Sequence, residues 1–311
     1  MLDVRRMRVL REVAGRGSFS AAADALDYTQ SAISQQIAAL EREAGTKLVE
    51  RGSRGIHLTE AGRALVAHAD VILARLADAE AELEAIAGLR GGRLRLGAFP
   101  SAGGTIMPPA IARFRERHPG VELTLTPVEP EDGMDQLRSG DLDVSLDIRT
   151  SFAANPDDGI DRVPLLADPM YVALPIDHPK AGKRSLKLED LSEENWILGS
   201  TGSCPDASIF LRSCQAAGFD PTIVFNSDDY PSIQGFIAAG MGVSFIPDLA
   251  LMSVREDIVV RSLGARAPAR HIAAATLKGS YKSPAKQTMI DVLVEIGEEF
   301  SRGRAELSLA S

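Results

Sequence analysis

Residues 18–45 read SFSAAADALDYTQSAISQQIAALEREAG, and this stretch decides the architecture of the first part of the chain. Ser18 is a favourable N-cap residue, and the alanines at 21–23 allow a short helix to pack closely against a neighbour. After a short turn, Thr29 can cap a second helix, whose apolar residues recur at helical spacing up to Gly45. The pattern predicts a helix, a tight turn and a helix, in which the second helix of the pair can enter a DNA major groove.

The side chains expected on the exposed face of this second helix are uncharged hydrogen-bonding groups. Gln can pair with adenine through two hydrogen bonds, and Ser can contact most base edges. A merely soluble helix face would more often carry Glu and Lys, so both interpretations stay open at this point. The residues concerned are Gln30, Ser31, Ser34, Gln35 and Gln36.

The segments on either side extend this unit. Residues 4–14 predict a preceding helix, and residues 47–59 predict two short strands around a Gly/Ser turn. That turn carries Arg51 and Arg54, which suit phosphate contact or insertion into a minor groove. An ordinary surface hairpin would also tolerate these arginines.

A long helix is predicted from Thr59, as its cap, to Ala87. One stripe of this helix is apolar, with alternating steps of four and three residues, which is the seam of a coiled coil. A helix packed only on its own domain would show a wider apolar face, so we favour homodimerisation through this seam. The predicted seam consists of Leu65, Ala69, Ile72, Leu76, Ala79, Leu83 and Ile86.

Length, composition and charge limit the classes of protein to which the chain can belong. The 311 residues suggest two or three domains, and the net charge is −9. Residues 1–63 nevertheless hold ten Lys or Arg and eight Asp or Glu, so only this part is suited to a polyanion. The first residues show no secretion signal and no stretch is long enough for a membrane span, so we expect a cytoplasmic protein with no membrane partner. The chain has two cysteines and five histidines and no motif of a catalytic, metal or phosphate site, so we expect no enzyme, cofactor or metal.

From residue 93 strands alternate with helices, which predicts a mainly parallel sheet covered by helices. Gly88 to Gly92 would form a hinge before it, and residues 302–311 a flexible tail. The strands are expected at 94–98, 121–126, 144–146, 170–174, 196–198, 223–225 and 243–246, and the helices at 106–117, 131–138, 206–217, 230–239 and 284–300.

Several of these segments resemble the LysR-type transcriptional regulators. The resemblance is dense over residues 4–65, through Gly17 to Ala23, Thr29 to Ile37, Leu40-Glu41 and Leu58 to Gly62, and looser beyond, through Gly140 to Asp143 and Gly240 to Val243. Two positions depart from the family pattern: Gln35 stands where a basic residue is common, and Val49 where Phe is usual.

The resemblance implies an α/β protein with an N-terminal winged helix-turn-helix (1–59), a long linker coiled-coil helix and hinge (60–92), and an effector domain (93–301). The effector domain would be a two-subdomain α/β unit of periplasmic-binding-protein type, with subdomain I at 93–164 and 269–300 and subdomain II at 165–268. The implied partners are double-stranded promoter DNA with an interrupted palindrome, a small-molecule effector, a second copy of the chain in a homodimer or homotetramer, and RNA polymerase. The DNA-binding residues would be Ser18, Thr29, Gln30, Ser31, Ser34, Gln35, Arg51 and Arg54.

Effectors of such domains bind beyond the ends of the strands and between the subdomains. Hydroxyls and amides there can hold a carboxylate. If two of the acids at 129, 147 and 228 face the cleft, however, a neutral or cationic ligand becomes more favourable. The candidate residues are Ser101, Ala102, Thr105, Glu129, Asp147, Thr201, Gly202, Ser203 and Asp228.

Two alternatives to a ligand-responsive regulator stay open. Cys204 and Cys214 lie close to the sequence positions at which the peroxide-sensing branch of the family has its redox pair, which suggests a redox sensor. Against this, Pro205 follows Cys204 directly, and no basic residue that could activate the thiol lies between Cys204 and Arg212. A solute-binding protein without regulatory role would need only the effector domain, and residues 1–87 oppose it.

Overall fold

A computed structural model describes residues 1–52, 55–86, 92–151, 158–199, 205–264 and 267–310. The chain divides into two compact units, the first built on residues 1–89 and the second on most of residues 90–311. Each is described by itself. No helix among the described residues is both long enough and apolar enough to span a membrane.

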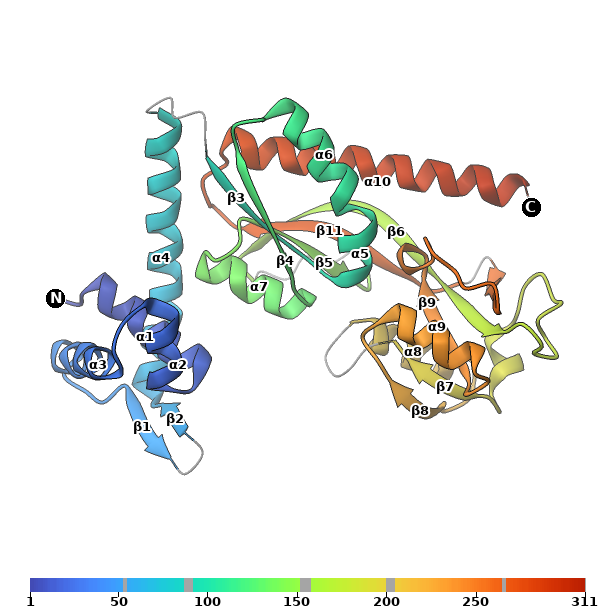
Figure 1. Cartoon of the computed structure of the whole chain (residues 1–311), viewed down its shortest axis with the longest axis horizontal. Helices are drawn as coiled ribbons and strands as arrows, with labels where there is room; N and C mark the ends of the chain where they lie inside the picture. Colours follow the sequence, from blue (N-terminus) through green and yellow to red (C-terminus); the bar gives the residue numbers. More distant parts are fainter. Residues whose placement is uncertain (53–54, 87–91, 152–157, 200–204, 265–266, 311) are drawn as a thin grey trace. The chain divides into compact units, whose positions relative to one another are not determined.

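The first unit begins with three helices, α1 (Val4–Arg16), α2 (Phe19–Leu26) and α3 (Gln30–Ala44), as the sequence predicted (Figure 1). Gly17 and Gly45 end α1 and α3 in the left-handed conformation, with φ of 63° and 70°, which glycine adopts without strain. Thr29 caps α3 by accepting a hydrogen bond from the Ala32 amide, whereas Ser18 stands at the N-cap of α2 without such a bond.

The predicted hairpin is also present. Strands β1 (Val49–Gly52) and β2 (Gly55–Leu58) pair antiparallel and form the wing. Helix α4 (Glu60–Ile86) follows, capped by the Thr59 hydroxyl, which accepts from the Gly62 amide at 2.9 Å. Gly62 lies against the Leu48 carbonyl so closely that a Cβ atom there would be 2.0 Å from its oxygen. Only glycine allows α4 to begin at this point against the wing.

The second unit contains one long sheet with the strand order β4-β3-β5-β11-β6-β9-β7-β8, and β10 pairs with β6. Its first half holds β3 (Arg93–Ala98), β4 (Glu122–Pro127) and β5 (Val144–Arg149), with β3 parallel to both neighbours. The helices of this half are α5 (Pro100–Thr105), α6 (Met107–Arg117), α7 (Pro130–Ser139) and α10 (Pro284–Ala310).

The second half of the sheet holds β7 (Asn195–Leu198), β8 (Thr222–Asn226) and β9 (Val243–Pro247), again parallel. Two helices, α8 (Pro205–Ala216) and α9 (Tyr230–Ala238), connect these strands. Short 3-10 helices, η1 (Leu188–Leu191) and η2 (Asp248–Ala250), and strand β10 (Ile258–Ser262) complete this half.

Two long antiparallel strands join the halves and correct the sequence analysis. β6 (Ile160–Pro175) pairs with β11 (Ala269–Leu277) along its first part and with β9 and β10 along its last part. The expectation of a mainly parallel sheet was therefore wrong at its centre. β10 and β11 were not foreseen, because no clear alternation marks them, and α10 extends to Ala310 instead of ending near 300.

Separate apolar cores support the two halves. One lies among β3, β5, β11, α6 and α10 and includes Phe99, Phe114 and Leu293. Others lie around β7 and β9 and are centred on Trp196, Phe210 and Ile246. Since each half has its own core, the segments that connect them, β6 and β11, control how the halves are joined.

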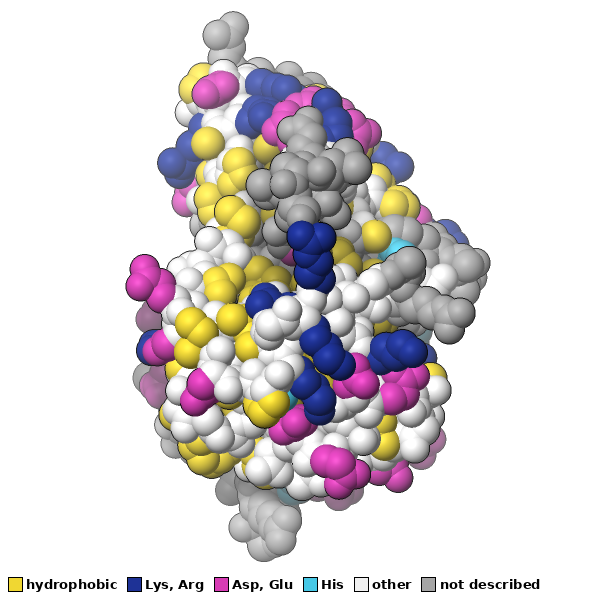
Figure 2. All heavy atoms as spheres, turned by 90° about the vertical axis from the view of Figure 1, so that its right-hand side faces the viewer, with side chains coloured by type: hydrophobic (Ala, Val, Ile, Leu, Met, Phe, Trp, Pro, Cys, Tyr) yellow, Lys and Arg dark blue, Asp and Glu magenta, His cyan; other side chains and the backbone are white. Residues whose placement is uncertain are grey.

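One face of the molecule is mixed in charge. On the face drawn in Figure 2, Lys and Arg side chains are interspersed with Asp and Glu (Figure 2). Such a mixture is typical of a solvated surface and lacks the single-sign field that favours a polyanion.

Candidate DNA-binding face and effector pocket

Helix α3 presents the polar strip that the sequence predicted. Gln30, Ser31 and Gln35 are exposed and Ser34 is half-buried, while the opposite side of the helix is buried in the core of the first unit. Gln36 departs from the expectation. It is half-buried, and its Oε1 accepts a hydrogen bond from Arg6 Nε at 3.1 Å, so it joins α3 to α1.

Glu41 is a structural residue of this unit that the sequence analysis did not single out. Its carboxylate is buried at the far end of α3 and accepts from the Leu48 amide at 2.9 Å, the Val49 amide at 3.4 Å and Lys47 Nζ at 2.7 Å. Burial opposes the charge, but these donors outweigh it and hold the pKa of Glu41 below its usual range. The charged carboxylate thus anchors the wing to the helix that carries the polar strip.

The side chains of the two wing arginines are not among the described parts of the structure. Arg51 belongs to β1, but its side chain is not described, and Arg54 lies outside the described residues. Their predicted contacts with DNA stay predictions.

The predicted seam of α4 divides into two parts. Leu65 packs against the core of the first unit and Ala69 is fully buried in it, so these two residues stabilise the winged helix-turn-helix itself. Farther along, Ile72, Leu76 and Leu83 are exposed large apolar side chains, and Ala79 is exposed too. The side chain of Ile86 is not described. The part of the seam open to a second helix therefore begins at Ile72.

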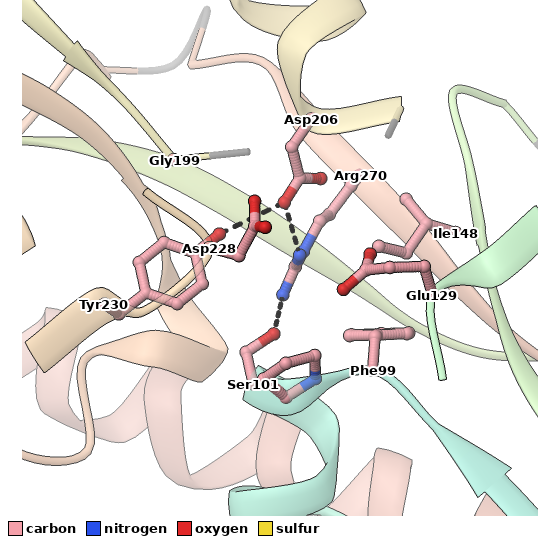
Figure 3. Close-up of a pocket in the computed structure, with 10 residues that line it drawn as sticks. Phe99, Ser101, Glu129, Ile148, Gly199, Asp206, Asp228, Tyr230 and Arg270 are labelled. Carbon is pink, nitrogen blue, oxygen red and sulfur yellow. Dashed lines mark hydrogen bonds and ion pairs between the residues drawn. The ribbon is translucent and has the colours of Figure 1, made fainter. Parts of the chain in front are cut away.

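The second unit contains a pocket at the junction of its two halves (Figure 3). It encloses about 290 Å³ of space, part of it open to solvent. Its walls come from the ends of β3, β4, β5 and β7, from the starts of α5, α8 and α9, and from β11. They are formed by Phe99, Pro100, Ser101, Glu129, Ile148, Gly199, Asp206, Asp228, Tyr230 and Arg270.

Arg270 on β11 lines this pocket, and each of its three guanidinium nitrogens donates a hydrogen bond. Nε donates to Asp168 at 2.7 Å, Nη1 to Asp206 at 2.7 Å and Nη2 to the Ser101 hydroxyl at 2.6 Å. The guanidinium also lies over the Phe99 ring, 5.1 Å from its centroid. Burial opposes its charge, but attraction to the two carboxylates prevails and raises the pKa of Arg270 above its ordinary value.

This network joins the two halves of the sheet. Ser101 belongs to the first half, whereas Asp206 begins α8 in the second and also accepts from the Tyr230 hydroxyl at 3.1 Å. Asp168, on β6, is completely buried and accepts in addition from the Leu249 amide at 3.0 Å. The burial of the Asp168 charge is tolerated because its carboxylate has these partners.

The predicted effector residues are only partly brought together. Ser101, Glu129 and Asp228 line the pocket, whereas Thr201, Gly202 and Ser203 lie outside the described residues. The remaining three, Ala102, Thr105 and Asp147, are not among the described lining residues of this pocket.

The reasons are visible in their contacts. The Asp147 carboxylate pairs with Arg162 Nε at 2.6 Å, the Thr105 hydroxyl is directed to the carbonyls of Ser101 and Leu249, and Ala102 is buried in the core.

The sequence analysis did not identify three of the lining residues, Arg270, Asp206 and Tyr230. The signal for Arg270 is present in the sequence, because an arginine two residues before the apolar run Ile272 to Ala275 requires a buried acid if that run belongs to a central strand. Strand β11 itself was not expected, so the requirement could not be recognised.

Only one of the two cysteines proposed as a redox pair lies among the described residues. Cys204 lies outside the described residues, and Cys214 is fully buried on α8 in the core around Trp196. Burial and the nearby Asp220 raise the pKa of the Cys214 thiol to about 12, so it is protonated at neutral pH and a poor nucleophile.

Comparisons with known proteins agree with both units. Residues 4–63 match the family model "Bacterial regulatory helix-turn-helix protein, lysR family", and residues 87–297 match "LysR substrate binding domain". Two similar curated proteins are a probable hydrogen peroxide-inducible genes activator of Mycobacterium avium (32% identity, 86% of this chain and 85% of that protein) and the transcriptional regulator AlsR of Bacillus subtilis (28% identity, 84% and 86%).

Solved structures show the same fold. A full-length OxyR variant from Pseudomonas aeruginosa matches with a TM-score of 0.70 at 24% identity, covering 96% of this chain and 95% of that one. CbnR, a LysR family transcriptional regulator, matches with a TM-score of 0.66 at 23% identity, covering 95% and 99%. The two family models together span most of the sequence, and the chain therefore belongs to the LysR family of bacterial helix-turn-helix transcriptional regulators.

Proposed function

We propose that this regulator binds an interrupted palindrome in double-stranded promoter DNA as a homodimer, or as a homotetramer made from two dimers. The observation that carries the proposal is the exposed, uncharged strip of Gln30, Ser31 and Gln35 on α3, beside a buried face that fixes the helix in its unit. Glutamine and serine read base edges, and a helix N-terminus favours a phosphate.

A second copy of the chain binds the second half-site of the palindrome. Ile72, Leu76 and Leu83 expose apolar surface at seam spacing on α4, which two copies can cover by packing against each other. Two α3 helices then meet two half-sites, as a palindrome requires.

The pocket around Arg270 is proposed to hold the small-molecule effector. Ser101 and Glu129 reach it from the first half of the sheet, and Asp206, Asp228 and Tyr230 from the second. A ligand that contacts both halves can favour one arrangement of them over another, and only such a preference can shift the equilibrium. We propose that this shift changes DNA bending and access of RNA polymerase to the promoter.

This function places the protein in the cytoplasm, where its DNA is, and it requires no catalytic step. Neither alternative gains support from the structure. The described thiol, Cys214, is buried and protonated, and a solute-binding protein has no use for the residues 4–63 that match the family's DNA-binding model.

A gel-shift titration with the DNA upstream of the regulator's own gene tests the proposal. We expect one sequence-specific complex whose affinity falls steeply with salt. Gln35→Ala should weaken specific binding by about 1–3 kcal/mol and leave the salt slope unchanged, because base contacts release no counterions.

Gln215→Ala provides the matched control, since Gln215 is an exposed glutamine on α8 in the second unit. Binding that ignores sequence, or equal affinities for the two variants, contradicts the proposed role of α3.

A further inference from the structure

The charges that line the pocket are strongly unequal. Three of the described lining residues are acids, Glu129, Asp206 and Asp228, and only Arg270 is basic. Directly behind Arg270 lies a fourth carboxylate, that of the completely buried Asp168. This part of the molecule therefore holds four carboxylates and one guanidinium, and Figure 3 shows the three carboxylates that line the pocket.

The one cation among the described lining residues is already paired with two carboxylates. All three nitrogens of the Arg270 guanidinium donate, to Asp168, Asp206 and Ser101, at 2.6 to 2.7 Å. Nη1 and Nη2 each keep a second N–H group, but two buried carboxylates, those of Asp168 and Asp206, already share the charge of Arg270, so an anionic ligand would add a third negative charge to one positive charge. The existing network thus selects against negatively charged ligands.

Asp206 has unused capacity for a donor. Its Oδ2 accepts from Arg270 Nη1 and from the Tyr230 hydroxyl, whereas its Oδ1 is buried and has no hydrogen-bond partner among the described residues. Buried carboxylate oxygens without a donor are rare, because the desolvation of the charge is then uncompensated. A positively charged N–H group supplies the missing hydrogen bond and a second positive charge beside the two buried carboxylates that share Arg270.

The rest of the pocket suits the same chemistry. Glu129 and Asp228 are exposed acids at its walls, and Tyr230 adds an aromatic side chain to the lining. We propose that the effector of this regulator carries a cationic nitrogen group, an ammonium, guanidinium or amidinium, which binds Asp206 and is held by the field of Glu129 and Asp228. The proposal rests on the proposed function of this pocket as the effector site.

Two isosteric series test it on the full-length protein by calorimetry and thermal shift. One series is benzamidine, benzamide and benzoate, and the other is butylamine, 1-butanol and butanoate. We expect the cation of at least one series to bind about tenfold more tightly than its neutral and anionic isosteres, with an affinity that falls as salt rises. Preference for an anion, or no preference for the cation in either series, overturns the proposal.

Variants locate the binding site of the cation. Asp206→Asn should reduce the affinity for the preferred cation about tenfold or more, because it removes a buried counter-charge. Glu129→Gln and Asp228→Asn change exposed residues, so they keep the fold and should each reduce the affinity about two- to fivefold.

Asp177→Asn, an exposed acid in the turn after β6, is the matched control and should leave the affinity unchanged. A cation that binds all four variants as it binds the wild type does not occupy this pocket, which also overturns the proposal.

The gel shift with promoter DNA, run on the same samples, separates the two ideas. Specific DNA binding without cation preference refutes only the ligand class. Cation preference without specific DNA binding refutes only the proposed regulatory function.

Discussion

Removal of the Glu41 carboxylate should loosen the wing from the helix that bears the polar strip. The bond to the Leu48 amide, at 2.9 Å and buried, is charge-assisted and contributes about 1.5–3 kcal/mol. The Val49 amide, at 3.4 Å, adds little, and the Lys47 side chain is 78% exposed, so its ion pair adds about 0–1 kcal/mol. We expect Glu41→Ala to destabilise the wing by about 2–3 kcal/mol and Glu41→Gln, which retains an acceptor, by about 1 kcal/mol.

The effect must also depend on pH. Because the folded-state pKa of Glu41 is lowered, its contribution is fully present above the ordinary glutamate pKa of about 4.5 and is lost as the pH falls through the lowered value. The stability of the wild-type wing should therefore fall in that acidic window, and Glu41→Gln should flatten this dependence. This dependence of stability on pH is opposite in sign to that of a group whose pKa is raised on folding.

Hydrogen exchange of the full-length protein, followed at the Leu48 and Val49 amides, measures the local opening free energy. A loss of about 2–3 kcal/mol corresponds to roughly 30- to 150-fold faster exchange. Glu50→Gln removes the same charge from an exposed position on β1 and should change exchange little. If Glu41→Ala accelerates exchange no more than Glu50→Gln, or if Glu41→Gln keeps the acid dependence, the carboxylate does not anchor the wing.

Three further perturbations separate the roles of other residues. Arg270→Met should destabilise the second unit by about 3–5 kcal/mol, because it leaves two buried carboxylates without a counter-charge. Urea unfolding followed by the fluorescence of Trp196 measures this loss of stability. A loss below about 1 kcal/mol would show that the network does not stabilise the second unit. The pair Leu76→Glu and Leu83→Glu should shift the oligomer towards single protomers in sedimentation velocity, since both side chains are exposed on the predicted seam; an unchanged sedimentation coefficient would place the dimer contact elsewhere. Cys214 should resist iodoacetamide at pH 8 in the folded protein, because its pKa is raised to about 12; modification as fast as in urea would refute its burial.

The sequence by itself determined the first unit almost completely. Local signals specify it: a cap at Thr29, left-handed glycines at Gly17 and Gly45, and apolar residues at helical spacing between them. These interactions span a few residues, so a linear pattern contains them. The same stretch carries the resemblance to the LysR-type regulators, which the match of residues 4–63 to the family model confirms.

Only the tertiary structure decided the composition of the pocket. Arg270, Asp168 and Asp206 lie far apart in the sequence. The antiparallel pairing of β6 and β11, which no local pattern indicates, brings Arg270 and Asp168 together, and the start of α8 adds Asp206. The same holds for Asp147, which stands at the end of a parallel strand as expected but is directed to Arg162. A buried charge takes its partner from whichever strand lies beside it, and strand neighbours are set by the packing of the whole sheet. Sequence spacing therefore indicated candidate acids for the pocket, and the fold alone determined which of them are already paired and which oxygen still lacks a donor.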